Sequence, residues 1–477
     1  MTHEDATHKI KALKECLITL TTTSGNLNLR TAIQELGDSI TVGDISHTTG
    51  VAIGRNIRQV INQFTLPPEA TAALLDLRVL LGTALGLDTD HYQWSTLIAD
   101  KTHDFVGRDY VFHAIDQFME SYSHGYLTIK GDPGLGKSAI LAEYVRRTGC
   151  IAHFNMRTLG ITSSTQFLQN VCTQLIIDAA LSYPSLPVET TRDGAFFLKL
   201  LHEVAEKLRP DERLVITVDA LDEVDLETHP TGANILFLPP TLPDHVYVVM
   251  TCRNIEVPLV AQAPQEVCDL MAHPAENRSD VEHYLHQALG RPALLAWMDR
   301  RSLTGAVFVS TLADLSENNF MYLRYVLPEI ERERGMYQNL SIERLPLGLE
   351  RYYEDHWHHM GMMAKPLPRD KIRIVYILCE VHQPVSRTLI CEFATDQTHP
   401  IDELTVQEVL DEWRQFLHDQ QIPESAPRYS LYHTSFRDFL HRKDIVQAAG
   451  VTIQGIHAII SGDLWGSLFG EDDFLKE

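Results

Sequence analysis

The feature that most constrains the fold of this chain is a glycine-rich stretch at residues 131–138, which directly follows a short apolar run at residues 126–129. The stretch reads Gly-Asp-Pro-Gly-Leu-Gly-Lys-Ser and completes the pattern G-x-x-x-x-G-K-[ST]. Glycines let the backbone curl until several N–H groups point at one anion, and a following helix adds the positive end of its dipole. The apolar run before the stretch and the helical pattern of residues 138–145 after it predict a phosphate-binding loop between a strand and a helix.

The loop residues have distinct expected roles. Lys137 is expected to reach the β- and γ-phosphates of a nucleotide, and the Ser138 hydroxyl to supply an oxygen to Mg²⁺. The predicted nucleotide-binding residues of the loop are Gly131, Pro133, Gly134, Leu135, Gly136, Lys137, Ser138 and Ala139. A glycine-rich turn without a ligand is the alternative interpretation.

Apolar runs alternate with helical patterns from about residue 101 to residue 275. This alternation is typical of a parallel α/β sheet. The candidate strands are residues 126–130, 150–155, 214–218, 246–250 and 266–270. The first, third and fourth end at polar residues, as expected where a ligand binds beyond the carboxyl ends of parallel strands.

The strand at residues 214–218 ends in a carboxylate, Asp219, which we expect to hold Mg²⁺ opposite Ser138. The next residue is Ala220, where motor-type ATPases usually carry a water-activating glutamate. Asp222 and Glu223 follow, and one of them is expected to polarise the attacking water, so that any hydrolysis is slow. A solvated acidic loop is the alternative for these two residues.

Two further segments complete the predicted site. Arg253 follows the fourth apolar strand and is expected to face the γ-phosphate, although an arginine at a strand end can also be a plain surface charge. Upstream, Phe105-Val-Gly-Arg108 precedes a helix. The backbone of Val106 and Arg108 is expected to lie against adenine.

Composition limits the class of partner and the compartment. The chain has 477 residues, enough for about three domains, and a formal net charge of -24, which argues against a broad nucleic-acid surface. Its seven cysteines are scattered, without a C-x-x-C pair, as expected in a reducing cytoplasm. It shows no secretion signal and no uncharged apolar run of about 18 residues, so we expect a cytoplasmic protein without a membrane partner.

The pattern along the chain predicts five parts. We expect a small adaptor or self-association module at 1–100, a nucleotide-binding domain at 101–275, a helical domain at 276–365, a winged-helix domain at 366–445, and a tail or the start of a sensor region at 446–477. The winged helix is inferred from three expected helices, near residues 370–380, 386–394 and 404–419, and from an expected strand at residues 428–433.

Four motifs in a fixed order carry a resemblance to a known family. Residues 105–108, 131–138, 218–223 and 251–253 together resemble the STAND class of P-loop NTPases, and Asp219-Ala-Leu-Asp-Glu223 resembles its NACHT branch. Further along, residues 316–323 resemble the family's helix entry beside the base, which places Phe320 at the nucleotide. Residues 345–349 resemble a bacterial and fungal NACHT subgroup, and residues 432–440 the winged-helix histidine motif.

The resemblance implies a P-loop α/β domain followed by helical and winged-helix domains, with ATP or ADP and Mg²⁺ as ligands. It also implies a switch in which His433 touches the β-phosphate of ADP and holds a closed form. Exchange for ATP then permits assembly into a homo-oligomer after a protein trigger or sensor acts. The implied process is bacterial defence against phage or related signalling. For His433 alone, a histidine packed within the winged helix is the alternative.

Two rival functions remain open on the sequence. A turnover ATPase or nucleic-acid motor is opposed by Ala220 and by the acidic balance, and a winged-helix transcription regulator by the expected helix 404–419, in which Arg414 is the one basic residue. A histidine cluster at 356, 358 and 359 suggests a metal site. We expect these side chains to face solvent instead, because no cysteine or carboxylate pattern accompanies them.

Overall fold

The computed structural model describes residues 94–469, with short internal gaps. These gaps are residues 180, 182, 184, 185, 227, 228, 231, 333, 334, 396–399 and 421–425, and for residues 462–469 only the backbone is described. The predicted module of residues 1–100 therefore lies outside the described residues except for residues 94–100. The end of the predicted tail, from residue 470, lies outside them as well.

The described chain divides into two compact units. The first unit holds residues 94–132, 136–155 and 162–284, and the second holds residues 133–135, 156–161 and 285–469. The predicted domain boundaries stay predictions, and each unit is described below by itself.

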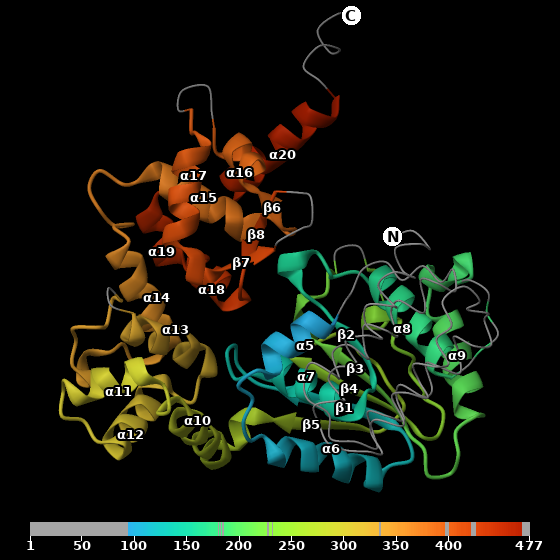
Figure 1. Ribbon diagram of the computed structural model, residues 1–477. Helices are drawn as coiled ribbons and strands as arrows, with labels where there is room; N and C mark the ends of the chain where they lie inside the picture. Colours follow the sequence, from blue (N-terminus) through green and yellow to red (C-terminus); the bar gives the residue numbers. More distant parts are fainter. Residues whose placement is uncertain are drawn as a thin grey trace, which may run out of the picture. The chain divides into compact units, whose positions relative to one another are not determined.

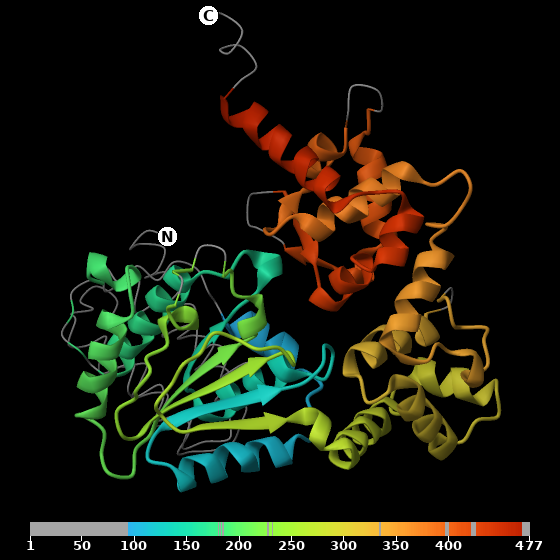
Figure 2. The same ribbon diagram turned by 180° about the vertical axis from the view of Figure 1, so that it is seen from behind.

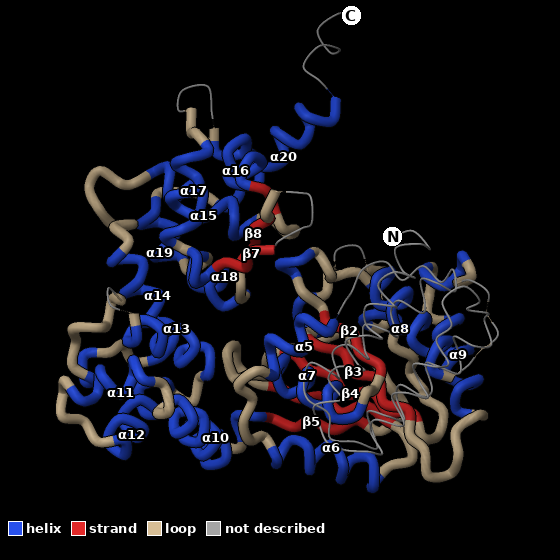
Figure 3. Tube along the Cα trace, viewed as in Figure 1, coloured by secondary structure: helices blue, strands red, loops and turns tan. Residues whose placement is uncertain are grey.

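The first unit is built on a five-stranded parallel sheet (Figures 1 and 3). Its strands lie in the order β2-β3-β4-β1-β5, and every neighbouring pair is parallel. They are β1 (Gly125–Lys130), β2 (Ile151–Phe154), β3 (Leu214–Asp219), β4 (Val246–Cys252) and β5 (Gln265–Asp269). The structure thus confirms the predicted α/β class with a parallel sheet.

Helices cover this sheet and explain the composition of its strands. Every residue of β3 and β4 is buried, so these strands read as unbroken apolar runs and not as an alternating pattern. In Figure 1, α5 and α7 lie in front of the strands, and the view from behind in Figure 2 shows the strands in front of these helices. The helices are α5 (Trp94–Thr102), α6 (Asp109–Ser121), α7 (Lys137–Thr148), α8 (Ser164–Asp178) and α9 (Ala195–Ala205), and α10 (Pro274–Ala288) carries the chain into the second unit.

The second unit is mainly helical. Its helices are α11 (Pro292–Asp299), α12 (Gly305–Ser316), α13 (Phe320–Glu331), α14 (Gly348–His359), α15 (Arg369–Glu380), α16 (Arg387–Ala394), α17 (Glu403–Glu412), α18 (Thr434–Leu440), α19 (Lys443–Ala449) and α20 (Ile453–Phe469). Three short strands, β6 (Val385–Ser386), β7 (Leu417–Gln420) and β8 (Arg428–Leu431), form an antiparallel sheet in the order β6-β8-β7.

The expected helix over residues 404–419 is wrong in its second half. The helix α17 ends at Glu412, a 3₁₀ turn spans Arg414–Phe416, and residues 417–420 form β7. The backbone groups of β7 bond to β8, with Leu417 opposite Leu431, and the side chains of Trp413 and Phe416 are buried. The pairing of β7 with the following strand β8 and the burial of aromatic side chains therefore override the local helical pattern, and Arg414 lies in the turn.

The expectation for the histidine cluster is confirmed for two residues and wrong for the third. His358 and His359 are exposed, whereas His356 is only 3% exposed. Its ring contacts those of Trp413 and Phe416, at centroid distances of 5.2 and 4.7 Å. Burial lowers the pKa of His356 to about 3, which keeps the ring neutral and part of the aromatic core.

Candidate functional site

The glycine-rich loop joins the end of β1 to the start of α7, as the sequence predicts. Gly134 and Gly136 have φ values of 85° and 87°, a left-handed backbone that glycine adopts without strain. No side chain caps the first turn of α7, and a Cβ built on Gly136 would meet nothing within 4 Å. Because the first N–H groups of a helix have no partner within the helix, this helix start fits an anion.

Lys137 is the first residue of α7 and folds back over the loop. Its ammonium donates hydrogen bonds to the carbonyl oxygens of Gly131, at 2.6 Å, and Asp132, at 3.0 Å. Burial lowers the pKa of Lys137, while the charges of Asp222 and Asp219 raise it and that of Arg253 lowers it. The charges of these two carboxylates and of this arginine, which come from distant parts of the sequence, therefore shift the pKa of the loop lysine.

Asp219 is 3% exposed at the carboxyl end of β3. The hydroxyl of Thr251, on the neighbouring strand β4, donates to its Oδ1 at 2.5 Å and accepts the N–H of Ala220 at 2.8 Å. Burial raises the pKa of Asp219, and hydrogen bonds from Ser138 and Thr251 lower it. The structure thus brings the two predicted Mg²⁺ ligands, Ser138 and Asp219, together. Their hydroxyl and carboxylate oxygens are the hard donors that Mg²⁺ prefers.

The sequence-based interpretation missed two residues that hold Asp219. Thr251 is one, and Asn155, directly after β2, is the other: its amide donates to the carbonyl oxygen of Asp219 at 2.6 Å. Both are almost fully buried. Two features of the sequence could have indicated them. Thr251 is a polar residue within the apolar run of β4, and Asn155 is a polar residue directly after β2.

Asp222 and Arg253 form an ion pair in the same region. The Asp222 Oδ1 accepts the backbone N–H of Arg253, and its Oδ2 lies 2.9 Å from the Arg253 Nε. The Asp222 side chain is 7% exposed and that of Arg253 24%. Glu223 ends the 3₁₀ turn Leu221–Glu223. The catalytic roles of these three residues and of Asp219 stay predictions.

The predicted adenine contact involves Val106 and Arg108, which lie just before α6. Both are buried, and the Arg108 guanidinium donates hydrogen bonds to Asn277 and to the Tyr110 hydroxyl. Its backbone N–H donates to Asp280 at 3.2 Å. The side chain of Arg108 thus ties α6 to α10, and the contact of this backbone with adenine stays a prediction.

In the second unit, Phe320 lies beside the loop segment 133–135, which is counted with that unit. The Phe320 N–H donates to the Gly134 carbonyl at 3.1 Å, and the Asn319 side chain donates to the Pro133 carbonyl at 3.0 Å. Asn319 also caps α13. The structure therefore brings Phe320 and Gly134 together, and Asn319 was not predicted.

His433 is the N-cap residue of α18. Its Nδ1 accepts the N–H of Ser435 at 3.1 Å and lies 2.6 Å from the Ser435 hydroxyl. That hydroxyl in turn lies 2.8 Å from the Tyr353 hydroxyl. The predicted contact of His433 with a nucleotide phosphate joins the two units and stays a prediction.

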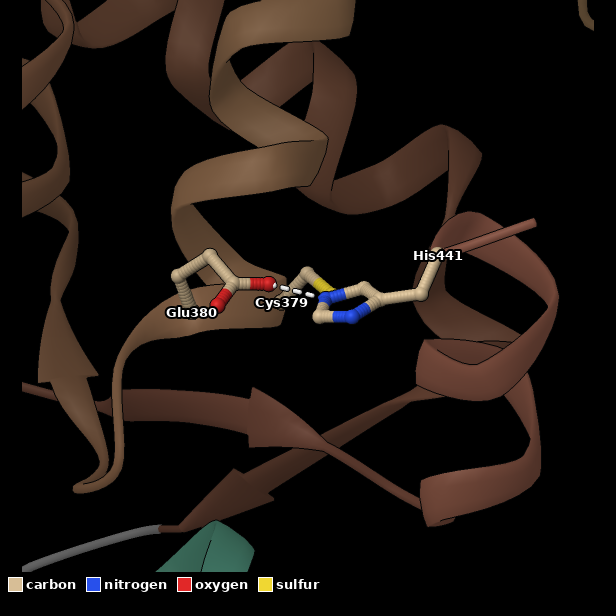
Figure 4. Close-up of side chains that lie close together, drawn as sticks. All are labelled: Cys379, Glu380 and His441. Atoms are coloured by element: carbon tan, nitrogen blue, oxygen red, sulfur yellow. Dashed lines mark hydrogen bonds and ion pairs between the residues drawn. The ribbon is translucent and has the colours of Figure 1, made fainter. Parts of the chain in front are cut away.

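Cys379, Glu380 and His441 have the donor atoms of a metal site and lie close together in the second unit (Figure 4). The Glu380 side chain is fully buried, and its oxygens lie 2.5 Å from His441 Nε2, 3.1 Å from Arg437 and 2.7 Å from His457 Nε2. An arginine bound directly to the carboxylate opposes a metal cation. We therefore interpret Glu380 as a hydrogen-bonded hub that joins α15, α18 and α20.

Within the described residues, no helix is long and apolar enough to cross a membrane. No protein-family model matches the chain. The chain is 26% identical over 181 residues, 35% of its length, to the NACHT domain- and WD repeat-containing protein 1 of Mus musculus, and it covers 11% of that protein.

Among solved structures, that of Drosophila ORC bound to DNA matches with a TM-score of 0.25 and 12% identity, over 70% of this chain and 91% of that chain. So loose a superposition carries no argument. The similarity to a NACHT-domain protein, the glycine-rich loop and the five-stranded parallel sheet together point to a nucleotide-binding P-loop NTPase.

Proposed function

We propose that this chain is a nucleotide-controlled molecular switch of the NACHT type. In this proposal ADP, bound at Gly131–Ser138 with Mg²⁺, holds a closed form, and exchange for ATP permits assembly into a homo-oligomer. A protein trigger or sensor partner starts the exchange, and the process is bacterial defence against phage or related signalling. The similarity to a NACHT-domain protein supports the class, and the biological process rests on resemblance alone.

The observation that carries the proposal is the convergence of chemistry at the carboxyl ends of three strands. Lys137 and Ser138 follow β1, Asp219 ends β3, and Arg253 follows β4. The charge of Asp219 raises the pKa of Lys137 and that of Arg253 lowers it, and a hydrogen bond from Ser138 lowers the pKa of Asp219. A cation for phosphate, two oxygen ligands for Mg²⁺ and an arginine are thus held together by residues distant in sequence.

Two features favour a switch over a turnover enzyme. Ala220 has no acid to activate water, and Asp222, an alternative acid, accepts from Arg253 through both oxygens. We therefore propose slow hydrolysis. The helices α15–α18 and the small antiparallel sheet β6-β8-β7 support a winged-helix domain. In this proposal the winged-helix domain moves with the helical domain when ATP replaces ADP.

Changing Lys137→Ala tests the proposal directly, because the site then lacks the cation that faces a polyphosphate. In wild type, ADP at about a hundred times its Kd should stabilise the fold by about 2.7 kcal/mol. We expect ADP with Mg²⁺ to raise the melting temperature of wild type and not that of Lys137→Ala. Lys199→Ala, which removes an exposed lysine of α9 in the same unit, is the matched control. An equal ADP shift in wild type and Lys137→Ala would show that the loop is not the nucleotide site.

A further inference from the structure

Asp222 contacts Arg253 at two points. It accepts the backbone N–H of Arg253 at 2.9 Å through one carboxylate oxygen and contacts the guanidinium Nε at 2.9 Å through the other. The side chain of Asp222 is almost fully buried and that of Arg253 is mostly buried. The ion pair is therefore weakly screened by salt and fixes the direction of the arginine side chain.

This pair lies beside the start of the glycine-rich loop. In the parallel pairing of β1 with β4, Lys130 stands opposite Cys252. Gly131 and Arg253 are the next residues of the two strands, so they leave the sheet side by side. The charges of Asp222 and Arg253 both act on the pKa of Lys137, which shows that the pair is within electrostatic reach of the loop lysine.

A guanidinium binds carboxylate and phosphate with the same two-pronged geometry. A terminal phosphate near Lys137 and the carboxylate of Asp222 are therefore competing anions for one arginine. A nucleoside diphosphate lacks that third phosphate.

We propose that Asp222 sets the discrimination between nucleoside triphosphate and diphosphate, by holding Arg253 until Arg253 exchanges this carboxylate for a terminal phosphate. The inference rests on the proposed nucleotide site. Because the exchange breaks the ion pair, Asp222 weakens triphosphate binding relative to diphosphate binding. The site thereby favours the diphosphate-bound form until triphosphate is in excess.

The test uses four forms of the full chain: wild type, Asp222→Asn, Arg253→Gln and the double variant. Asp222→Asn replaces the carboxylate by an amide of the same length, whose Oδ1 still accepts the N–H of Arg253. Arg253→Gln replaces the guanidinium by a shorter, uncharged amide. Calorimetric titration with Mg²⁺ gives the Kd for ADP and for adenosine 5′-(β,γ-imido)triphosphate, which is not hydrolysed. Asp225→Asn, three residues further along, is the control for loss of a neighbouring negative charge.

Asp222→Asn should tighten binding of the triphosphate analogue about tenfold, which corresponds to about 1.4 kcal/mol, with ADP within about twofold of wild type. Arg253→Gln should weaken the analogue about tenfold. The ratio of the analogue Kd to the ADP Kd should agree within about twofold between the double variant and Arg253→Gln, because the carboxylate discriminates between the two nucleotides only through the arginine.

Two results would overturn the inference. Asp222→Asn could change both affinities equally, or its effect could persist when Arg253 is already changed, which would mean that Asp222 acts on Mg²⁺ or on water directly. If Asp222→Asn does not fold, the comparison of Arg253→Gln with the double variant still tests the proposal, because a difference of more than about twofold in the ratio of the two Kd values contradicts it. Failure of the nucleotide site itself is seen separately, as absent binding in wild type or unchanged binding in Lys137→Ala.

Discussion

The Thr251 hydroxyl holds the ends of two strands together, since it bonds both the Asp219 carboxylate and the Ala220 N–H. Changing Thr251→Val keeps the shape of the side chain and removes both hydrogen bonds. We expect a loss of about 1–3 kcal/mol of unfolding free energy, because buried polar groups lose their partner. The predicted Mg²⁺ ligand also loses its orientation, so Mg²⁺-dependent ADP binding should weaken.

Thr217→Val is the matched control, because Thr217 is a buried threonine on β3 whose hydroxyl donates to the Ile151 carbonyl. This control should lower the melting temperature and leave the Mg²⁺ dependence of binding intact. Equal Mg²⁺ dependence in wild type and Thr251→Val would contradict the positioning role of Thr251.

The buried ring of His153 leads us to predict that the stability of the first unit depends on pH. The ring is fully buried in β2 and packs edge-on against the rings of Trp94 and Phe167. Burial lowers its pKa to about 3, whereas an unfolded histidine titrates near about 6.5. On acidification through this window the unfolded chain takes up the proton and the folded chain does not, so stability falls with pH by at most about 1.4 kcal/mol per unit.

Changing His153→Leu should remove this contribution and leave the protein equally or more stable at neutral pH, because a buried polar ring is replaced by an apolar side chain. The measurement is the difference in unfolding free energy between wild type and His153→Leu from pH 7 to pH 4. A difference that does not change with pH would show that the ring titrates alike in the folded and the unfolded chain.

The contact of α15, α18 and α20 through Glu380 predicts a large effect of a single buried charge. Changing Glu380→Gln leaves the guanidinium of Arg437 without its carboxylate, and we expect a loss of about 3 kcal/mol. The control is Glu412→Gln, which breaks the partly exposed pair of Glu412 with Lys371 and should cost less than about 1 kcal/mol.

Thermal unfolding of both variants, with and without a chelator, checks the interpretation of Glu380 as a hub. For protein freed of nucleotide, so that no Mg²⁺–ADP is present, the hub predicts that EDTA leaves the melting temperature of wild type unchanged. A decrease with EDTA in wild type that disappears in Glu380→Gln would identify a metal site at Cys379, Glu380 and His441 instead.

The elements that the sequence predicts well are those whose pattern is set locally. The strands β3 and β4 are buried on both faces, so each appears as an apolar run, and the glycine-rich loop carries its own backbone requirements. The end of α17 could not be predicted, because β7 pairs with a strand that follows it in the chain. The ion pair of Asp222 with Arg253 also depends on the turn after Ala220, and no local pattern encodes that turn.

For the molecule as a whole, the proposed closed form depends on His433. Its ring also caps α18, so a simple truncation would mix two effects. Changing His433→Asn keeps an acceptor at the helix start, since asparagine is a good N-cap residue, and removes the imidazole. We expect ADP to dissociate about ten- to a hundredfold faster from His433→Asn, because hydrogen bonds to charged groups contribute about 1.5–3 kcal/mol.

ADP release and particle mass should be measured together with the melting temperature. His418→Ala, which removes an exposed histidine of β7, is the control and should behave as wild type. A normal ADP off-rate in His433→Asn would limit His433 to capping and packing.

The left-handed backbone of Ala220 bears on how this chain can evolve. Its φ of 50° and ψ of 58° are costly for any residue with a Cβ, by about 1–2 kcal/mol, whereas glycine adopts them freely. One base change in an alanine codon can give either glycine or glutamate. Glycine would relax the backbone, and glutamate, the residue of a fast hydrolase, would retain the strain. Relief of backbone strain at this position therefore favours a change to glycine, which like alanine has no acid to activate water, and gives no such advantage to glutamate.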